Sequence, residues 1–395
     1  MIKLQSNPFY KGLTSQLFTD GIAAEVLAFH EKINGYDATP LVSLKKLASH
    51  IGVKNIFVKD ESKRFGLNAF KVLGGSYALG KLLAEKLDVP ITELDFKTVG
   101  TLLPEPLTFT TATAGNHGTG VAWAARELGQ KAVVFMPKGS AQASVDRIKS
   151  LGAACIVTDV NYDDTVRLAS MEADSKGWTL VQDTAWKGYV KIPSWISQGY
   201  MTMAKEAFDQ LATRGEGKPT HVFLQAGVGA MAGGILGYCA DVLGPRNFTS
   251  VIAEPAAADC LFRSVSTDDG HRVAVTGSLN SIMAGLACGE VNPVTWDILR
   301  DTGNFYISAD DSIAAAGMRV LGNPLSGDTG IISGESGALN MGVLYYLMTS
   351  AEPKIQQYRA QIGLTEESEI LIFSTEGDTN PARYRSIVWD GMLPL

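Results

Sequence analysis

The sequence has few of the residues that form disulfides or metal centres. Its 395 residues include four cysteines and five histidines, and the cysteines show no CxxC or Cys/His metal spacing. So few thiols in a long chain are typical of buried, small apolar side chains. We therefore expect no disulfide scaffold and no metal site.

Signals for a membrane, for export and for polyanionic partners are also absent. The start, MIKLQSNPFY, lacks the charged and apolar regions of a signal peptide, and the weakly polar stretch 227–244 is rich in glycine and interrupted by Asp241. The chain has no Lys/Arg-rich run, and 34 basic against 41 acidic residues give a net charge of −7. We expect a cytoplasmic protein without a membrane span or a nucleic-acid partner.

What is present is a chain that can bury a large core, with 46% hydrophobic and 19% charged residues. Its length exceeds what one compact core usually reaches, so we expect two domains. Apolar segments rich in β-branched residues predict strands at 55–58, 107–111, 132–136, 154–158, 221–225, 249–253 and 370–374. Between them, helices are expected at 121–128, 143–151, 162–176 and 197–212. This alternation predicts an α/β fold with a parallel sheet covered on both faces.

A glycine-rich loop follows the expected strand 221–225. Residues 226–234 read AGVGAMAGG and lead into an apolar helix. Small residues let several backbone N–H groups point at one phosphate, helped by the positive end of the helix dipole. The spacing matches neither the Rossmann nor the P-loop pattern, so a single phosphate group fits better than a nucleotide. Close helix–sheet packing is the alternative reason for such a loop.

Lys71 stands at the expected start of a helix, within the segment NAFKVLGGS at 68–76. Burial among apolar and small neighbours disfavours the ammonium form and favours a neutral amine that can form an imine with an aldehyde cofactor. The alternative is a surface lysine whose stem covers apolar neighbours.

A third loop, TATAGNHGTG at 111–120, joins an expected strand to an expected helix. Its hydroxyl and N–H groups are suited to a carboxylate, and the amide of Asn116 is suited to a phenolic oxygen. A capped helix start is the alternative. Ligands of doubly wound sheets lie beyond the C-terminal strand ends, so the loops after Thr111, Gln225 and Ser374 are expected to converge on one site.

These loops, in this order, resemble those of the fold-type II pyridoxal 5′-phosphate (PLP) enzymes, the group of tryptophan synthase β and threonine dehydratase. Within that group the chain closely resembles the diaminopropionate ammonia-lyases, over nearly its whole length. The matching segments are DESKRFGLNAFK at 60–71, MPKGSAQ at 136–142, QDTAW at 182–186, residues 282–289, GNP at 322–324, SGESGA at 333–338 and STEGDT at 374–379.

The resemblance implies a fold of two lobes, each with a largely parallel sheet covered by helices, and PLP in the cleft between them. The large cofactor-binding domain is expected at 1–85 and 211–395, and a smaller inserted domain with the asparagine loop at 86–210. The proline-rich segment 102–106 and the polar segment 214–219 are the candidate hinges. A homodimer is also implied.

For the cofactor, the resemblance implies that Lys71 binds the PLP aldehyde and that Asn116 lies by its 3′-oxygen. It implies a hydroxyl group opposite the pyridine nitrogen, for which Ser374 is preferred and Thr375 comes next. A neutral partner leaves that nitrogen less protonated, which suits prompt β-elimination. The residues implied to wrap the phosphate are Gly227, Val228, Gly229, Ala230 and Met231.

For the substrate, the resemblance implies a small amino acid. Asp183, in the QDTAW segment, is expected to contact a β-amino group or to act as an acid; a loop or cap hydrogen bond is the alternative. Cys260 and Cys288 stand where the ammonia-lyases have cysteines that can pair, although reduced thiols are favoured here. The residues expected at the substrate are Thr111, Thr113, Ala114, Gly115, His117, whose part in this family is generally structural, and Glu335.

Ala114 departs from the pattern of the ammonia-lyases. They carry an aspartate in this place, within TDGNHG, which is thought to take the α-proton of the D-enantiomer, while the lysine takes that of the L-enantiomer. Thr119 also stands where these relatives have arginine. We therefore expect turnover of D-substrates to be lost or much reduced. Serine and threonine dehydratases have an alanine here, in SAGNH, so the change indicates either a different natural substrate or a substituted lyase.

Three functions follow from these residues. The first is PLP-dependent α,β-elimination from L-2,3-diaminopropionate, or an N-substituted relative, to pyruvate and ammonia. The second is dehydration of a serine- or threonine-type hydroxy amino acid, which would release one ammonia per pyruvate in place of two. The third is a catalytically silent binding protein, which the presence of Lys71, Asn116 and the phosphate loop disfavours.

Overall fold

The computed structural model describes residues 1–113 and 115–395 of the chain. The chain divides into two compact units. The first unit comprises Met1–Asp20, Ala38–Ala69 and Met203–Leu395, and the second comprises Gly21–Asp37 and Phe70–Thr202. Residues 21–37 and 70–85 thus go with the second unit, whereas the ranges proposed from the sequence placed them in the large domain.

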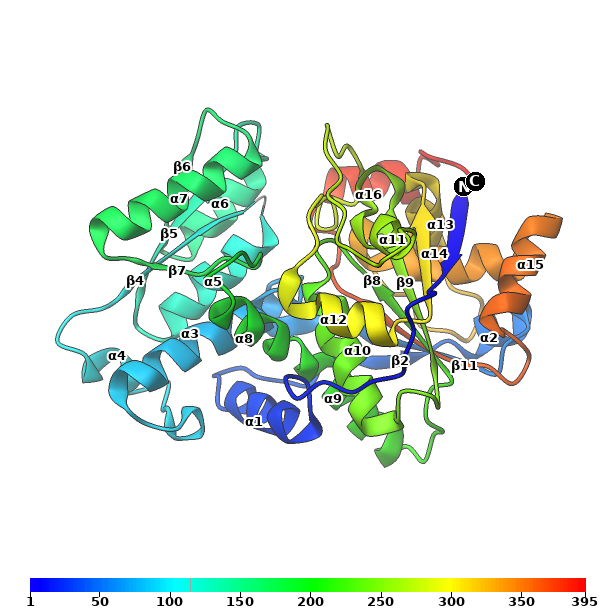
Figure 1. Ribbon diagram of the computed structural model, residues 1–395, viewed down its shortest axis with the longest axis horizontal. Helices are drawn as coiled ribbons and strands as arrows, with labels where there is room; N and C mark the ends of the chain where they lie inside the picture. The colour runs from blue at the N-terminus through cyan, green and yellow to red at the C-terminus, as the bar shows by residue number, and fades with distance from the viewer. Residues whose placement is uncertain (114) are drawn as a thin grey trace. The chain divides into compact units, whose positions relative to one another are not determined.

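The first unit is built on a seven-stranded sheet with the order β1-β10-β9-β8-β11-β3-β2 (Figure 1). The five central strands are parallel, and the edge strands β1 and β2 run antiparallel to their neighbours. The strands are β1 (Ile2–Ser6), β2 (Leu41–Ser43), β3 (Asn55–Asp60), β8 (His221–Gln225), β9 (Thr249–Pro255), β10 (Phe305–Ala309) and β11 (Glu369–Ser374).

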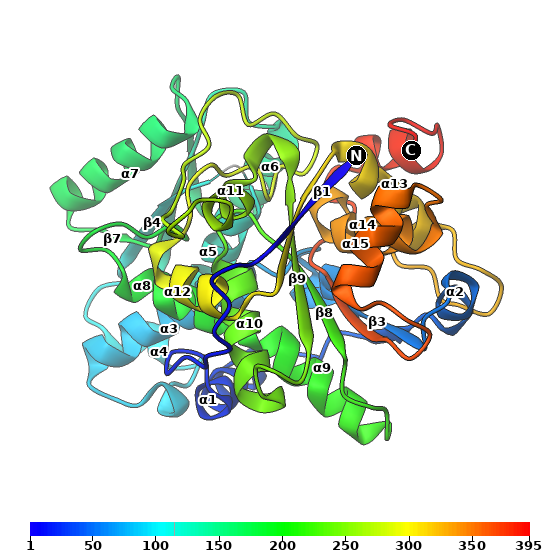
Figure 2. The ribbon, with the colours of Figure 1, turned by 45° about the vertical axis from the view of Figure 1, so that its right-hand side comes forward.

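Helices cover both faces of this sheet. One face carries side chains such as Val58, Phe223 and Ile372, which belong to a core shared with α13 and α14. Alternate residues of the same strands, Phe57 and Leu371 among them, are also buried, and β8 and β9 lie between α10 and α14 in Figure 2. Burial on both faces explains why these strands show no polar alternation. The helices are α2 (Lys45–Ile51), η1 (Glu61–Gly66), α9 (Met201–Thr213), α10 (Ala230–Leu243), α11 (Cys260–Val265), α12 (Pro293–Thr302), α13 (Asp311–Gly322), α14 (Glu335–Thr349), α15 (Pro353–Ile362) and α16 (Pro381–Val388).

The second unit holds a four-stranded parallel sheet with the order β6-β5-β4-β7. Helix α7 packs on the face that carries Ala112 and Phe135, and α5 lies on the opposite face, where Gly118 approaches Val134. The strands are β4 (Thr108–Ala112), β5 (Lys131–Met136), β6 (Ala154–Val157) and β7 (Thr179–Leu180). The helices are α1 (Asp20–Glu31), α3 (Val72–Leu87), α4 (Val99–Leu102), α5 (Asn116–Glu127), α6 (Gln142–Ser150), α7 (Tyr162–Lys176) and α8 (Lys191–Gly199).

The α/β class and the parallel sheets predicted from the sequence are confirmed, and all seven expected strands form. Two helix predictions were wrong in their bounds. The helix expected at 197–212 is interrupted at Tyr200, which separates α8 from α9, and α5 begins at Asn116, five residues earlier than expected. Glycines at 115, 118 and 120 hid this earlier start, because glycine is a poor helix former. In the described part of the chain, no helix is long and apolar enough to cross a membrane.

Candidate active site

Lys71 is the residue that precedes α3, and its amine pairs with a carboxylate of the same unit. Its Nζ donates to Oδ2 of Asp183 over 2.7 Å, and the lysine side chain is 20% exposed. The ring of the preceding residue, Phe70, packs on Tyr200 with 4.8 Å between ring centroids. The lysine is therefore neither a free surface lysine nor an isolated buried amine, and it remains accessible to a small molecule.

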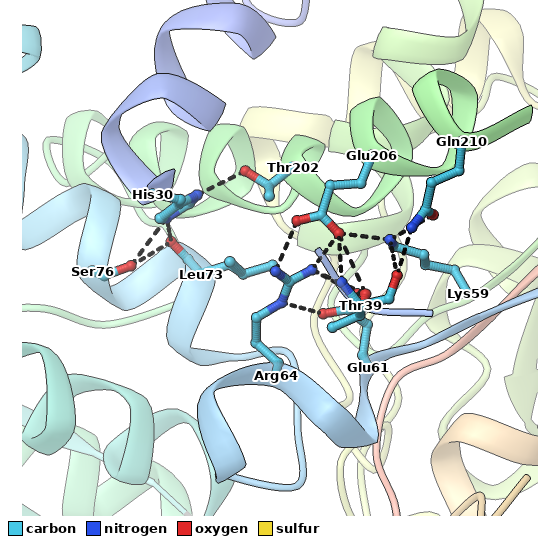
Figure 3. A network of polar contacts seen from close by, with 10 residues as sticks. All are labelled: His30, Thr39, Lys59, Glu61, Arg64, Leu73, Ser76, Thr202, Glu206 and Gln210. Atoms are coloured by element: carbon cyan, nitrogen blue, oxygen red, sulfur yellow. Dashed lines mark hydrogen bonds and ion pairs between the residues drawn. The ribbon is translucent and has the colours of Figure 1, made fainter. Parts of the chain in front are cut away.

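The first turn of α3 is anchored by a histidine that the sequence did not single out. His30 of α1 contacts the carbonyl of Leu73 and the hydroxyl of Ser76 through Nε2, at 3.1 and 3.0 Å (Figure 3). Its Nδ1 lies 2.7 Å from the hydroxyl of Thr202. Because His30 is fully buried, these contacts fix the helix start that presents Lys71.

The loop between β4 and α5 approaches the backbone of Lys71 closely. A Cβ at Gly120 would lie 2.9 to 3.0 Å from backbone atoms of Lys71 and Val72, so only glycine fits there. The hydroxyl of Thr113 accepts the backbone N–H groups of Gly115 and Gly118 at 3.0 and 3.2 Å. This loop brings Asn116, the first residue of α5, to the same unit as Lys71. Ala114 lies outside the described residues.

Asp183 follows β7 and is tied to β4 through its neighbour Gln182, which the sequence analysis did not select. The amide of Gln182 accepts from the N–H of Ala112 and donates to its carbonyl, both at 3.0 Å. It also accepts the hydroxyl of Thr111 at 3.0 Å. Thr111 therefore positions the Asp183 loop, and in this structure its hydroxyl is used within the protein.

The charges around Asp183 favour an ionised carboxylate. Burial acts to raise the pKa of Asp183, but the charge that His117 has when protonated, the ammonium of Lys71 and the hydrogen bond from Lys71 bring this pKa well below its usual range. Burial also lowers the pKa of His117. A carboxylate held ionised in this way suits the binding of a cationic group better than the donation of a proton.

The glycine-rich loop of the first unit lies where β8 passes into α10. Gly229 has a left-handed backbone (φ 93°) directly before the helix, and the N–H of Asn292 holds the carbonyl of Val228 at 2.8 Å. The first N–H groups of a helix have no partner within it, and the helix dipole adds positive potential. The start of α10 therefore has the N–H groups that a phosphate loop requires, and the binding of a phosphate at 227–231 stays a prediction.

Hydroxyl groups follow β11 in the same unit. Ser374 is fully buried and donates to the hydroxyl of Ser333 at 2.8 Å, while Thr375 accepts from the amide of Gln225 at 3.0 Å. Gln225 accepts in turn from Asn340 at 2.7 Å. The loops after β8 and β11 are thus joined through Gln225, whereas the loop after Thr111 belongs to the other unit.

Glu335 begins α14 close to a second carboxyl group. Burial, and after it the charge of Glu376, raises the pKa of Glu335 to about 7. Its Oε1 is buried without a hydrogen-bond partner among residues 1–113 and 115–395, with Arg383 Nε 3.8 Å away. A carboxyl group of this kind can be neutral or charged near neutral pH, as expected of a residue at a ligand site.

A buried group of charges, which the sequence did not reveal, fixes the segment that leads to Lys71. Arg64 of η1 binds Glu61 and Glu206, with Nη distances of 2.8 to 2.9 Å, and Lys59 lies 2.6 Å from Glu206 (Figure 3). All four side chains are at most 2% exposed. Thr39 adds hydrogen bonds to Glu61 and Glu206.

One cysteine lies at the glycine-rich loop, because the Sγ of Cys260 is 3.7 Å from the carbonyl of Gly227. All four cysteines are free thiols, and burial raises the pKa of Cys260, which lowers its reactivity. No group of three His, Cys, Asp or Glu residues that could hold a metal occurs in the described ranges.

The predicted residues thus form two sets, one in each unit. Taken by itself, the second unit offers the amine of Lys71, and the first unit offers the helix start at 227–231 and the hydroxyl of Ser374. The predicted residues of the second unit are Lys71, Thr111, Thr113, Gly115, Asn116, His117 and Asp183, and those of the first are Gly227, Val228, Gly229, Ala230, Met231, Glu335, Ser374 and Thr375.

Comparison with known proteins adds independent findings. A family model described as "Pyridoxal-phosphate dependent enzyme" matches residues 33–357. The chain is 55% identical over 390 residues to diaminopropionate ammonia-lyase of Escherichia coli K12, which covers 99% of this chain and 97% of that protein. It is 49% identical over 402 residues to the enzyme of the same name from Salmonella typhimurium, with 99% and 98% covered.

Solved structures agree. The crystal structure of the E. coli diaminopropionate ammonia-lyase in complex with an aminoacrylate-PLP azomethine reaction intermediate matches with a TM-score of 0.92 and 53% sequence identity. The match covers 100% of this chain and 98% of that one.

Proposed function

Because the chain belongs to the family of pyridoxal-phosphate dependent enzymes, we propose that it removes the β-amino group of L-2,3-diaminopropionate, or of an N-substituted relative. The products are pyruvate and ammonia. The two relatives described above support the proposal, because both are named diaminopropionate ammonia-lyase. It describes a carbon–nitrogen lyase of amino acid catabolism.

We assign the cofactor contacts to residues of both units. Lys71 is the residue that binds the cofactor aldehyde, Asn116 serves its phenolic oxygen, and the loop 227–231 serves its phosphate. Ser374, with Thr375 next to it, would offer a neutral hydroxyl to the pyridine nitrogen. When bound, PLP supplies a conjugated ring that accepts electron density from the substrate's α-carbon. Thr113, Gly115 and Glu335 are proposed at the substrate.

The observation that carries the proposal is the ion pair between Lys71 and Asp183. A carboxylate that holds the lysine ammonium at 2.7 Å has the charge and the hydrogen-bonding capacity to hold the β-ammonium group of diaminopropionate in its place. A β-ammonium group already carries the proton with which it departs as ammonia. Lys71, freed as an amine, is the base that takes the α-proton.

The same pair argues against the second function, dehydration of a hydroxy amino acid. Departure of a hydroxyl as water requires a proton donor, and an aspartate whose pKa is well below its usual range is a poor donor at neutral pH. Ala114 is the feature that favours a dehydratase, because the hydroxy amino acid enzymes show alanine at this place of the loop.

The test is release of ammonia and a 2-oxo acid by the PLP-loaded protein with L-diaminopropionate or L-serine, which both give pyruvate, and separately with L-threonine, which gives 2-oxobutyrate. Two ammonia per pyruvate from L-diaminopropionate supports the lyase. Turnover of a hydroxy amino acid, with silence on diaminopropionate, overturns the proposal in favour of a dehydratase. Lys71→Ala tests the cofactor assignment: after borohydride treatment, wild type keeps PLP on the Lys71 peptide and the variant does not, whereas Lys81→Ala behaves as wild type.

We further propose that the protein is a homodimer, as the resemblance implies, and that it is located in the cytoplasm. Light scattering of the purified protein gives the oligomeric state, and a monomer overturns that part. Cell fractionation checks the location.

A further inference from the structure

His117 has one proton position that its surroundings fix. Its Nε2 lies 2.9 Å from the carbonyl of Val181. A carbonyl only accepts hydrogen bonds, so Nε2 carries a proton. In a neutral imidazole the second nitrogen, Nδ1, then bears a lone pair.

That lone pair faces an acceptor. Nδ1 lies 3.8 Å from Oδ2 of Asp183, and it is buried without a hydrogen-bond partner in the part of the chain that the structure describes. Two acceptor groups opposite each other in a buried place are unfavourable. One proton on Nδ1 would turn the same geometry into a charge-assisted contact that serves both residues.

Two influences now oppose that proton, and two favour it. Burial and the positive charge of Lys71 lower the pKa of His117, whereas the charge of Asp183 and the hydrogen bond to the carbonyl of Val181 act to raise it. Asp183 already has a cationic partner in Lys71, through the same Oδ2 atom. If Lys71 ceases to be an ammonium, one opposing influence disappears and Asp183 loses a partner.

We propose that His117 is a positioning residue: it takes up a proton at Nδ1 and becomes the cationic partner of Asp183 when Lys71 is no longer an ammonium. One proton enters from solvent and forms the Nδ1–H bond, and it returns when the lysine ammonium forms again. The proposal rests on the proposed function, in which Lys71 is engaged at the cofactor. His117 then keeps Asp183 ionised and ready for the substrate's β-ammonium group.

The other groups that face this pair do not compete for the proton. Tyr200 and Tyr189 are buried phenols whose pKa is raised, chiefly by burial, so both are neutral near pH 7. The amide of Gln182, 3.5 Å from Oδ1 of Asp183, carries no charge. With a neutral His117, the cation beside Asp183 is Lys71, and a protonated His117 would be the second.

The test follows the protonation of His117 by NMR of histidine nitrogens in the full chain. Five histidines give five sets of signals, and His117→Asn identifies the set of His117. In the cofactor-free wild type, Nδ1 of His117 is expected to be unprotonated at pH 7. In Lys71→Met, its titration midpoint is expected to rise by about one pH unit or more. In Lys71→Met with Asp183→Asn, that rise is expected to vanish.

Lys81→Met is the matched control, because it removes a lysine of α3 that pairs with Glu25, away from His117. It should leave the midpoint of His117 unchanged. Lys71→Ala, which also removes the ammonium, should show the same upward change as Lys71→Met and replaces it if that variant does not fold. Equal midpoints for His117 with and without the lysine ammonium overturn the inference.

The outcome is separate from that of the activity assay. Turnover of L-diaminopropionate with an unchanged His117 midpoint rejects the inference and leaves the proposed function standing. A His117 midpoint that rises without such turnover supports the proton exchange and rejects the proposed substrate.

Discussion

The amine of Lys71 and the carboxylate of Asp183 form an ion pair, 2.7 Å from Nζ to Oδ2. The two residues lie 112 positions apart in the sequence, yet both belong to one compact unit. Their pairing is therefore a property of that unit's own fold, and each side chain can be changed separately to measure what the pair contributes.

Asp183→Asn removes the charge and keeps the shape. Loss of a buried charged partner costs several kcal/mol, so kcat/KM for L-diaminopropionate is expected to fall about 100-fold or more, whereas any activity on L-serine changes far less. Steady-state assays with both substrates give the ratio. Asp174→Asn, an exposed aspartate of the same unit, serves as the control, and an equal loss on both substrates argues against a contact with the β-ammonium group.

Ala114→Asp tests one of the two residues at which the loop departs from the ammonia-lyases. Wild type is expected to act on L- but not D-diaminopropionate, because Lys71 is then its sole base. The variant adds a carboxylate that can take the α-proton of the D-enantiomer, so turnover of the D-form should appear. Ala114→Asn is the matched control without a base, and efficient D-turnover by wild type contradicts the expectation.

Glu206→Gln tests the buried charges around Arg64. The substitution removes the negative charge of Glu206, so the buried cations Lys59 and Arg64 lose a partner. Breaking a buried ion pair lowers the free energy of unfolding by about 3 kcal/mol or more. Urea unfolding measures the change in the free energy of unfolding. Glu216→Gln is the control, because the Glu216 carboxylate is more exposed and its partner Lys45 is as far as 4.0 Å away. This variant should stay within about 0.5 kcal/mol of wild type.

The contribution of Glu206 to the free energy of unfolding depends on pH. In the folded protein the pKa of Glu206 is lowered to about 2 from its ordinary value of 4.5. The stabilisation by Glu206 is therefore present above pH 4.5 and is lost as the pH falls toward 2. The difference in the free energy of unfolding between wild type and Glu206→Gln should therefore become smaller as the pH is lowered from 4.5 toward 2.

Glu335→Gln should show the opposite dependence. Its folded pKa is raised to about 7 from 4.5, so stability is highest below pH 4.5 and falls as the pH rises through 7, by about 3 kcal/mol in all. The cofactor-free variant lacks this loss. It should match wild type at pH 4 and unfold at higher urea than wild type at pH 8. Parallel pH profiles for the two proteins would contradict the assignment.

Much of this arrangement could be predicted from the sequence, because composition marks it locally. Strands such as 221–225 are short apolar runs between turn residues, and the loop 226–234 is conspicuous in its glycines. Lys71 was recognisable from its small and apolar neighbours. Each of these signals lies within about ten residues of chain.

The supporting contacts could not be predicted in this way. His30 meets Leu73 and Thr202, and Glu206 meets Arg64 across 142 positions, and no local pattern marks such pairs. Edge strands β1 and β2 were also missed, because each pairs on one side and shows no continuous apolar run. To predict the ion pair between Lys71 and Asp183, one needs both the local motifs and the fold that brings these two distant loops together.

The pairing of β1 with β10 sets an order on synthesis. The first strand of the chain, Ile2–Ser6, finds its partner only when Phe305–Ala309 has been made. Once residue 202 has emerged from the ribosome, every residue of the second unit is present, while the seven-stranded sheet still lacks β8, β9, β10 and β11. The half that carries Lys71 and Asp183 can therefore assemble during translation, and the half that carries the glycine-rich loop has to wait for the last strand.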